Sequence, residues 1–562
     1  MIEKSLRTDR VVFVVSAVIA GAFLAWGVFA TANLSSVSSA VLDWLITNTG
    51  WAFLLAATGF VLFALWLAFG RYGKIPLGQD GERPEFRTVS WIAMMFSAGM
   101  GIGLMFYGVA EPLSHFVAPP PGTVPGGTDA AVETAMATSL FHWAIHPWSI
   151  YAVVGLAIAY GSFRRGRKQL ISAAFAPLFG ERVSEGPMGR LIDILAIFAT
   201  LFGSAASLGL GALQIGSGLT EGGWLPEQPG VGLLVGVIAV LTVAFIASAV
   251  SGVARGIQWL SNINMVLAGV LAVFLFVVGP TIFILNMVPS AIGDYFREMG
   301  DMISRSGAQG GAAMESWLSS WTIFYWAWWI SWTPFVGMFI ARISRGRTIK
   351  HFVAGVILAP SVVSLLWFCL MGGTAINLQR SGTDLAGAGS SESQLFGMLE
   401  QFPLAGVAGV LVMVLVAIFF VSGADAASLV MGTLSQRGSI EPRTGLVVFW
   451  GVATGGVAAV MLMVGNGGES ALTGLQNLTI IAAAPFALVM IVLCVALAKD
   501  LRSDPMILRE EQSAEIVEQA VLVGNEEYDG DFCLQVAPTN GDGEVSDEEW
   551  TVVTRSMLED KV

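Results

Sequence analysis

The segment Trp321–Phe335, W-T-I-F-Y-W-A-W-W-I-S-W-T-P-F, sets the fold and suggests the kind of ligand. More than half of its side chains are aromatic, and it carries no formal charge. On a helix, Trp328, Trp329 and Trp332 project to about one face, because residues three and four apart are neighbours. Indole faces attract a quaternary ammonium group, whose diffuse charge is not held by strong hydrogen bonds. Tryptophans also mark membrane–water interfaces, so this segment alone leaves a ligand cage and an interfacial belt equally open.

The composition of the whole chain is that of a polytopic membrane protein. Of its 562 residues, 55% are hydrophobic and only 12% are charged. A helix of about 20 apolar residues crosses the hydrocarbon core of a bilayer. Searching for such runs predicts an all-α fold with twelve transmembrane helices. The predicted spans lie near 11–31, 51–70, 89–110, 138–161, 190–216, 231–251, 258–285, 316–341, 351–377, 402–435, 445–465 and 474–498.

The distribution of basic residues supports this count and predicts an orientation. If the N-terminus is cytoplasmic, 23 of the 28 Lys and Arg residues fall in cytoplasmic segments, and two more fall in the C-terminal tail. Only Arg297, Arg305 and Arg380 lie on the other side. Basic residues concentrate on the cytoplasmic side of membrane proteins, so we expect a multi-pass plasma-membrane protein with both termini cytoplasmic. No basic tract is interleaved with aromatic residues, so nucleic-acid binding has no support.

The third predicted span contains a run of glycines between Gly99 and Gly108, reading G-M-G-I-G-L-M-F-Y-G. Each glycine inside a helix costs about 1 kcal/mol relative to alanine. Either the helix is interrupted here so that its backbone faces a ligand, or Gly99 and Gly103 allow another helix to approach closely. We favour an interruption, because Gly101 and Gly108 are not needed for a packing face.

The fourth predicted span opens with F-H-W-A-I-H-P-W-S-I-Y, residues 141–151. Trp143 and Tyr151 lie two helical turns apart on about the same face. Pro147 between them should kink the helix. His142 and His146 have the i, i+4 spacing of metal ligands, but no third ligand lies nearby in the sequence, so we interpret them as polar packing or helix-end residues.

Polar side chains also occur in the fifth and tenth spans. Thr200, Ser204 and Ser207 either bond to their own helix backbone or offer oxygen ligands to a small cation. Asp425 lies on an apolar helix, where a carboxylate is costly and usually functional or paired. Its place near the predicted cytoplasmic end leaves open that it reaches out to the membrane surface.

Three motifs together resemble the betaine/carnitine/choline transporter (BCCT) family, and in particular its sodium-coupled glycine betaine permeases from actinobacteria. They are A-G-M-G-I-G-L-M-F-Y-G (98–108), F-H-W-A-I-H-P-W-S-I-Y-A (141–152) and F-Y-W-A-W-W-I-S-W-T-P-F-V-G-M-F (324–339), within a likeness that covers nearly all of 50–505. The resemblance implies a secondary active transporter, not an enzyme, with a LeuT-like core of two inverted five-helix repeats, assembled as a homotrimer.

The resemblance also implies a division of the chain into five parts. These are an N-terminal part with two peripheral helices (1–88), a first repeat (89–285), an external amphipathic segment (286–315), a second repeat (316–500) and an acidic cytoplasmic tail (501–562).

By the same resemblance, the substrate lies between an aromatic box and the glycine run. The implied substrate-binding residues are Trp143, Trp148, Tyr151 and Trp329 with Gly99, Met100, Gly101 and Gly103, and those lining the pathway are Phe324, Trp328 and Trp332. Choline-carrying relatives often have Asp at the position of Gly103. Glycine there favours a zwitterion over a bare cation.

Sodium is the coupling ion that the resemblance implies, at two sites. One site would use Ser97, Met100, Phe419 and Ser422, and the other would use Thr200, Ser204 and Phe335. Position 423 departs from the pattern, because it is Gly423 where sodium-coupled members typically have a second hydroxyl. The first site therefore lacks one ligand, and the ion preference stays open.

The C-terminal tail carries the net charge of the molecule. From Glu510 onward there are fifteen acidic residues and two basic ones, a balance of −13. We expect a short helix over Glu510–Leu522 and a mobile segment beyond it. Osmotically regulated relatives tend to have basic C-terminal helices, so regulation by the same mechanism is not implied here.

The expected function is import of glycine betaine or a similar zwitterionic compatible solute by sodium symport with alternating access. The alternative within the same fold is an ectoine, proline or carnitine carrier that works by proton coupling or exchange. A transporter-like receptor or channel is the remote alternative.

Overall fold

The computed structural model describes residues 7–534 except 100, 226–228, 388–389 and 466–468, and for 96–99, 251–261 and 469–470 it describes only the backbone. The described residues form helices and no strand, apart from one isolated bridge between Pro76 and Thr348. The chain divides into two units, 1–499 and 500–562.

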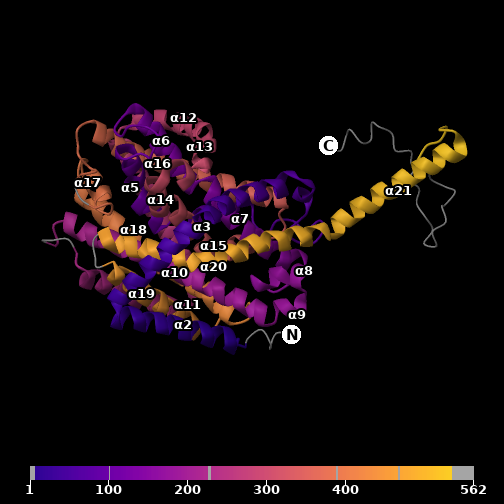
Figure 1. The fold of residues 1–562 in the computed structure, drawn as a ribbon, viewed down its shortest axis with the longest axis horizontal. Helices are drawn as coiled ribbons and strands as arrows, with labels where there is room; N and C mark the ends of the chain where they lie inside the picture. Colours follow the sequence, from indigo (N-terminus) through magenta and orange to yellow (C-terminus); the bar gives the residue numbers. More distant parts are fainter. Residues whose placement is uncertain (1–6, 100, 226–228, 388–389, 466–468, 535–562) are drawn as a thin grey trace. The chain divides into compact units, whose positions relative to one another are not determined.

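The first unit is a bundle of long helices (Figure 1). Its main helices are α2 (Arg10–Phe29), α3 (Thr31–Phe69), α4 (Thr88–Gly99), α5 (Ile102–Val117), α6 (Asp129–Trp143), α7 (Ile145–Ala159), α10 (Pro187–Glu221), α11 (Val231–Val278), α12 (Thr281–Arg297), α14 (Gly307–Leu318), α15 (Phe324–Arg342), α16 (Ile349–Arg380), α18 (Ala405–Ser435), α19 (Thr444–Val464) and α20 (Glu469–Arg502). The shorter elements are η1 (Arg71–Lys74), η2 (Tyr160–Arg164), η3 (Ser172–Phe175), α8 (Ala176–Phe179), α9 (Glu181–Ser184), α13 (Met299–Ser304), η4 (Ser319–Ile323) and α17 (Gln394–Leu399).

The predicted all-α polytopic membrane fold is confirmed, whereas the count of twelve helices is not confirmed as such. Among the described residues, nine helices are long and apolar enough to cross a membrane, or ten if one sharply bent pair is counted as a span. The glycine run divides its span into α4 and α5, each shorter than a full crossing. The span of the aromatic segment divides into η4 and α15, and α15 owes much of its bulk to Trp and Tyr, which are less apolar than aliphatic residues.

Two other predicted boundaries are wrong. α11 is one continuous helix across 252–257, where a loop was expected between two spans. The predicted span 258–285 is interrupted at Gly279–Pro280, where the helix direction turns by 110° into α12. Proline lacks the backbone N–H that would continue the helix, which accounts for the break.

The predicted interruption in the glycine run is confirmed. α4 ends at Gly99 and α5 begins at Ile102, with Gly101 between them in an extended conformation (φ −159°, ψ −175°). Met100, which was assigned to both the substrate and a sodium site, lies outside the described residues.

The fourth span is also interrupted, three residues before the predicted kink. α6 ends at Trp143, Ala144 is non-helical (φ −107°, ψ −110°), and α7 begins at Ile145. Pro147 explains the position of the break, because its missing N–H would have bonded to the carbonyl of Trp143 four residues earlier.

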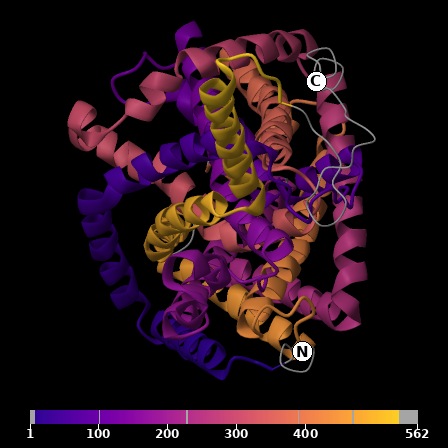
Figure 2. The same cartoon turned by 90° about the vertical axis from the view of Figure 1, so that its right-hand side faces the viewer.

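α15 lies at the centre of the bundle and positions the site. It packs against α7 on one side and α10 on the other, and nearly all of its residues are buried. In contrast, α2 and α3 run along one outer side of the bundle (Figure 2) and leave many apolar side chains exposed, as expected of helices that face lipid.

The second unit contains one described helix, α21 (Pro505–Tyr528). The side chain of Asp504 caps it by accepting a hydrogen bond from the N–H of Met506 at 2.9 Å, and Pro505 occupies the first helical position. Both residues are favoured at a helix start. The helix contains the predicted Glu510–Leu522 segment and is longer at both ends. The final part of the acidic tail, 535–562, lies outside the described residues.

Candidate functional site

The four residues of the predicted aromatic box come together in the structure. The ring centroids of Trp143 and Trp329 are 4.9 Å apart, those of Tyr151 and Trp329 are 6.2 Å apart, and those of Trp148 and Tyr151 are 5.3 Å apart. All three pairs are nearly perpendicular, and all four side chains are buried. These four side chains come from the end of α6, the first turns of α7 and the middle of α15.

The three predicted pathway residues extend this cluster along α15. Trp328 stacks on Trp329 with centroids 4.9 Å apart, and Phe324 stacks on Trp328 at 5.5 Å. Trp332 meets Trp328 edge-on at 6.1 Å. These rings contact other side chains of the bundle, so they do not form an interfacial belt, whose rings would face lipid and headgroups.

The glycine run lies directly against these rings. A Cβ atom on Gly103 would lie 2.7 Å from Cη2 of Trp328 and 2.8 Å from Cη2 of Trp143, well inside ordinary contact distance. A Cβ on Gly101 would lie 3.8 Å from Cη2 of Trp332, which is an ordinary contact. The backbone of Gly99 ends α4, and the position of its neighbour 100 is not described. Any side chain at position 103 would therefore have to displace two indoles in this conformation.

The residues of the second predicted sodium site lie on facing helices. Thr200 and Ser204 are buried on α10, which packs against α15. The two helices are linked beside Ser204, because Nε1 of Trp332 donates a hydrogen bond to the carbonyl oxygen of Gly203 at 2.9 Å. Phe335 lies three residues after Trp332 on α15, and the two ring centroids are 5.5 Å apart. The hydroxyl of Thr200 also donates to its own helix backbone at 2.9 Å.

The first predicted sodium site is only partly described. Phe419 and Ser422 lie on α18, where the hydroxyl of Ser422 donates to the carbonyl oxygen of Phe419 at 3.3 Å. Ser97 is in α4, but its side chain lies outside the described residues, as does Met100. A Cβ on Gly423 would meet no atom within 4 Å, so a larger side chain fits at that position.

Asp425 does not reach out to the membrane surface. Its side chain is fully buried, and one carboxylate oxygen accepts a hydrogen bond from the hydroxyl of Ser248 on α11 at 2.7 Å. This carboxylate therefore links α11 to α18.

One residue beside the box was missed by the sequence analysis. Glu111 is fully buried on α5 and accepts hydrogen bonds at one oxygen from Nε1 of Trp143 (2.6 Å) and from the hydroxyl of Tyr325 (2.5 Å). Its other oxygen lies 2.6 Å from Nδ1 of His142. Glu111 follows the predicted end of the third span by one residue, and this acidic residue beside an apolar run was the available signal.

The histidines of the fourth span have separate surroundings, in keeping with their interpretation as packing residues. His146 stacks on Trp326 with ring centroids 5.1 Å apart. The ring nitrogens of His142 contact Glu111 and the hydroxyl of Thr322, the latter at 3.0 Å. His115 joins Glu111 and His142 in a group whose nitrogen and oxygen atoms lie within 4.8 Å of one another, which is a spacing open to metal ligands.

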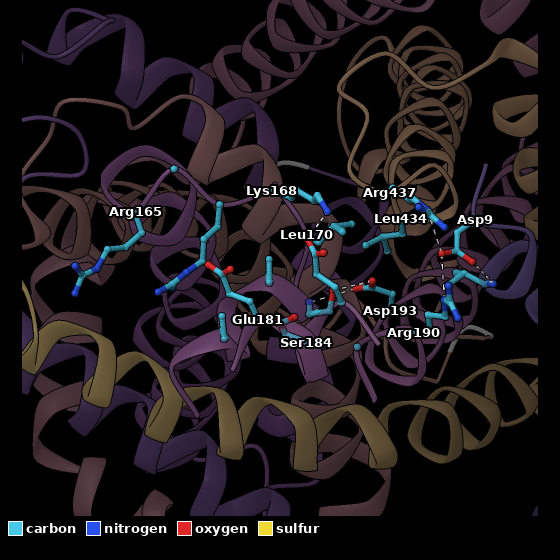
Figure 3. Close-up of a pocket in the computed structure, with 18 residues that line it drawn as sticks. Asp9, Arg165, Lys168, Leu170, Glu181, Ser184, Arg190, Asp193, Leu434 and Arg437 are labelled. Atoms are coloured by element: carbon cyan, nitrogen blue, oxygen red, sulfur yellow. Dashed lines mark hydrogen bonds and ion pairs between the residues drawn. The ribbon is translucent and has the colours of Figure 1, made fainter. Parts of the chain in front are cut away.

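Figure 3 shows a pocket of about 300 Å³, and none of the residues of the aromatic cluster lines it. At one side of it, the carboxylate of Asp9 contacts Nε of Arg190 at 3.2 Å and Nε of Arg437 at 3.3 Å. Burial favours the neutral form of Asp9. The backbone N–H of Val12 and the two arginine charges outweigh burial, so the pKa of Asp9 is lowered. These pairs tie the start of α2 to α10 and to the end of α18.

The bundle of apolar helices and the buried aromatic cluster beside a broken helix define a membrane transporter for a small solute. The chain belongs to the BCCT family, betaine/carnitine/choline family transporters, whose family model matches residues 11–506. It is therefore a transporter and not an enzyme.

Curated relatives match over most of their length. The chain is 48% identical over 531 residues to the betaine/ectoine transporter LcoP of Corynebacterium glutamicum, covering 94% of this chain and 84% of the relative. It is 44% identical to the glycine betaine transporter OpuD of Bacillus subtilis, covering 88% and 95%. It is 36% identical to an ectoine/hydroxyectoine transporter of Virgibacillus pantothenticus, covering 86% and 94%.

A solved structure of a Na⁺-coupled sialic acid symporter aligns with 84% of this chain and with 85% of the symporter chain, at a TM-score of 0.37 and 15% sequence identity. A likeness this distant carries no argument about site or mechanism.

Proposed function

We propose that the protein imports glycine betaine or a similar zwitterionic compatible solute by sodium symport with alternating access. The carrying observation is the buried cluster of Trp143, Trp148, Tyr151 and Trp329 beside the interrupted helix α4–α5. The relatives of this chain include a betaine/ectoine transporter and a glycine betaine transporter, which favours the same substrate class.

The chemistry of a trimethylammonium zwitterion fits this arrangement. Its cationic end has no hydrogen-bond donor, so aromatic faces hold it, each contributing about 0.5–2 kcal/mol depending on desolvation. Its carboxylate is favoured at the start of a helix, where backbone N–H groups are free and the helix dipole is positive. α5 begins beside the aromatic rings without a side-chain cap, so its first turn can receive the carboxylate.

Sodium coupling is proposed from the hydroxyls on α10. Thr200 and Ser204 would bind one ion with Phe335 as a cation–π partner across the α10–α15 contact, so that the ion links two helices. A second ion would bind near Phe419 and Ser422. The open space at Gly423 suggests that a water molecule completes this site in place of the missing hydroxyl.

The remaining features of the proposal concern assembly and placement. We propose a plasma-membrane homotrimer with both termini cytoplasmic, a core of two inverted repeats at 89–285 and 316–500, an external segment at 286–315 and a cytoplasmic tail from 501.

The deciding experiment is uptake of labelled glycine betaine into proteoliposomes with an inward sodium gradient, a matched potassium gradient, or a proton gradient. The proposal expects accumulation only with sodium. Uptake that is indifferent to sodium refutes symport, and uptake driven by protons would support the alternative coupling.

Ectoine is the second candidate substrate, because two relatives carry ectoine in their names. Competition settles the order of preference: unlabelled ectoine should inhibit betaine uptake more weakly than unlabelled betaine does. The opposite order would make ectoine the main substrate.

A further inference from the structure

Glu111 occupies a position from which one side chain can order the aromatic box. A single carboxylate oxygen accepts hydrogen bonds from Trp143 at 2.6 Å and from Tyr325 at 2.5 Å. Glu111 is on α5, Trp143 ends α6, and Tyr325 is in the first turn of α15. One oxygen atom therefore connects α5, α6 and α15, while α7 supplies the remaining two rings of the box.

The two donors both touch the central ring of the box. Trp143 contacts Trp329 edge-on with centroids 4.9 Å apart. Tyr325 lies nearly parallel to Trp329, with centroids 5.9 Å apart and an interplanar angle of 19°. An indole or phenol ring bonded at its polar atom cannot rotate freely, because rotation breaks the hydrogen bond. Glu111 thus fixes the orientation of two of the rings that contact Trp329.

The contacts on the other carboxylate oxygen complete a hydrogen-bonded network. His142 approaches this oxygen with Nδ1 at 2.6 Å, and its Nε2 lies 3.0 Å from the hydroxyl of Thr322. Both ring nitrogens of His142 and both oxygens of Glu111 are therefore engaged within the protein. This engagement favours a hydrogen-bonded network over a metal site, although His115 lies 3.5 Å from the same carboxylate oxygen.

We propose that Glu111 is a positioning residue that sets the affinity of the box for the quaternary ammonium group of the substrate. The inference rests on the proposed function, because it needs a substrate with that group. Glu111 acts through Trp143 and Tyr325. Removing its acceptor oxygen takes from both buried donors the carboxylate oxygen that they share, so that oxygen no longer holds either ring in place.

Two substitutions distinguish the effect of the acceptor oxygen from that of the rest of the side chain. E111Q keeps one oxygen for Trp143 and Tyr325, and its amide can donate to Nδ1 of His142, so betaine affinity should stay within about threefold of wild type. E111L removes the acceptor and should weaken betaine binding by about tenfold, the change that corresponds to 1.4 kcal/mol.

A matched control is available elsewhere in the bundle. The buried indole of Trp91 donates to the hydroxyl of Ser344 at 2.9 Å, outside the box. S344A therefore removes the acceptor of a buried tryptophan and should leave betaine affinity at the wild-type value.

The experiment measures the affinity of purified full-length protein for glycine betaine by calorimetry, and the KM and maximal rate of uptake in proteoliposomes. E111L should raise KM while keeping most of the maximal rate, which a general loss of folded protein would not do. In a W143F background, which lacks the indole N–H, E111L should cost less than about threefold, because one of the two ordered donors is already gone.

Several results would overturn the inference. The first is a betaine affinity of E111L equal to that of wild type. The second is a loss of betaine affinity in S344A as large as that in E111L. The third is a tenfold loss of betaine affinity when E111L is added to the W143F variant. If E111L does not fold, Y325F tests the same link by removing one donor, and an unchanged affinity in Y325F refutes it. Failure of wild-type protein to bind betaine refutes the proposed function as well, whereas wild-type binding with unchanged variants refutes this inference alone.

Discussion

Replacing Gly103 by alanine should weaken substrate binding through the two indoles that lie against it. The added Cβ would sit 2.7 Å from Trp328 and 2.8 Å from Trp143, whereas ordinary contacts of this atom are 3.4–4 Å. Each ring must therefore move by about 0.6 Å or more. Overpacking a buried site costs about 1–3 kcal/mol. Alanine recovers up to about 1 kcal/mol through its higher helix propensity.

Taking the middle of that overpacking range, about 2 kcal/mol, less up to about 1 kcal/mol for helix propensity leaves about 1–2 kcal/mol. This net cost predicts a loss of betaine affinity of roughly five- to thirtyfold. The assay is sodium-driven betaine uptake over a range of substrate concentrations, normalised to the amount of reconstituted protein. Gly59 provides the control, because it lies on the outer helix α3 and a Cβ there would meet no atom within 4 Å. A Gly103→Ala variant with the same KM as wild type would contradict the assignment of Trp143 to the aromatic box and of Trp328 to the pathway beside it.

Three further outcomes follow from the site and the pocket. Trp329→Leu should abolish high-affinity betaine uptake while the protein still folds, measured by uptake beside a size-exclusion profile; unchanged affinity would remove this ring from the box. Gly423→Ser should lower the sodium concentration needed for half-maximal uptake, because a Cβ there has open space; no change would mean that the site is unused or already complete. Asp9→Asn should remove the ion pairs with Arg190 and Arg437. The free energy of unfolding at pH 7 should then fall by up to about 1 kcal/mol, measured as a lower melting temperature. The pKa of Asp9 is lowered in the folded protein. The stabilisation by Asp9 is therefore present above the unfolded carboxyl pKa of about 3.9 and is lost as the pH falls through the folded pKa. The melting temperatures of wild type and variant should become equal in acid. A difference that persists at low pH would point to a cause other than charge.

The sequence predicted the fold class because that depends on local pattern, whereas the grouping of Trp143, Trp148, Tyr151 and Trp329 came from the resemblance to the family. Runs of apolar residues predict membrane helices, and the glycine run predicted the gap between α4 and α5. The prediction that Trp143 and Tyr151 share one helix face was wrong in its premise, because the chain is non-helical at Ala144 between them.

Features that depend on distant contacts could not be predicted from pattern. Glu111 meets Trp143 and Tyr325, which are 32 and 214 positions away in the chain. The burial of Asp425 depends on its contact with Ser248, 177 positions away. Two span boundaries were wrong for a different reason, since apolar runs do not reveal where a helix continues, as α11 does across 252–257, or where the chain turns sharply, as it does at Gly279–Pro280.

The break at Ala144 has a consequence for how the protein responds to its substrate. Trp143 lies before the break, while Trp148 and Tyr151 lie after it. A cation that contacts all three rings would link the two halves of one membrane span and restrict their relative motion. Changes in the angle between α6 and α7 would then be opposed by the bound solute and released when it leaves. Under the proposed function, occupancy of the box would thus stiffen the scaffold, and empty protein should bend at this point more easily than loaded protein.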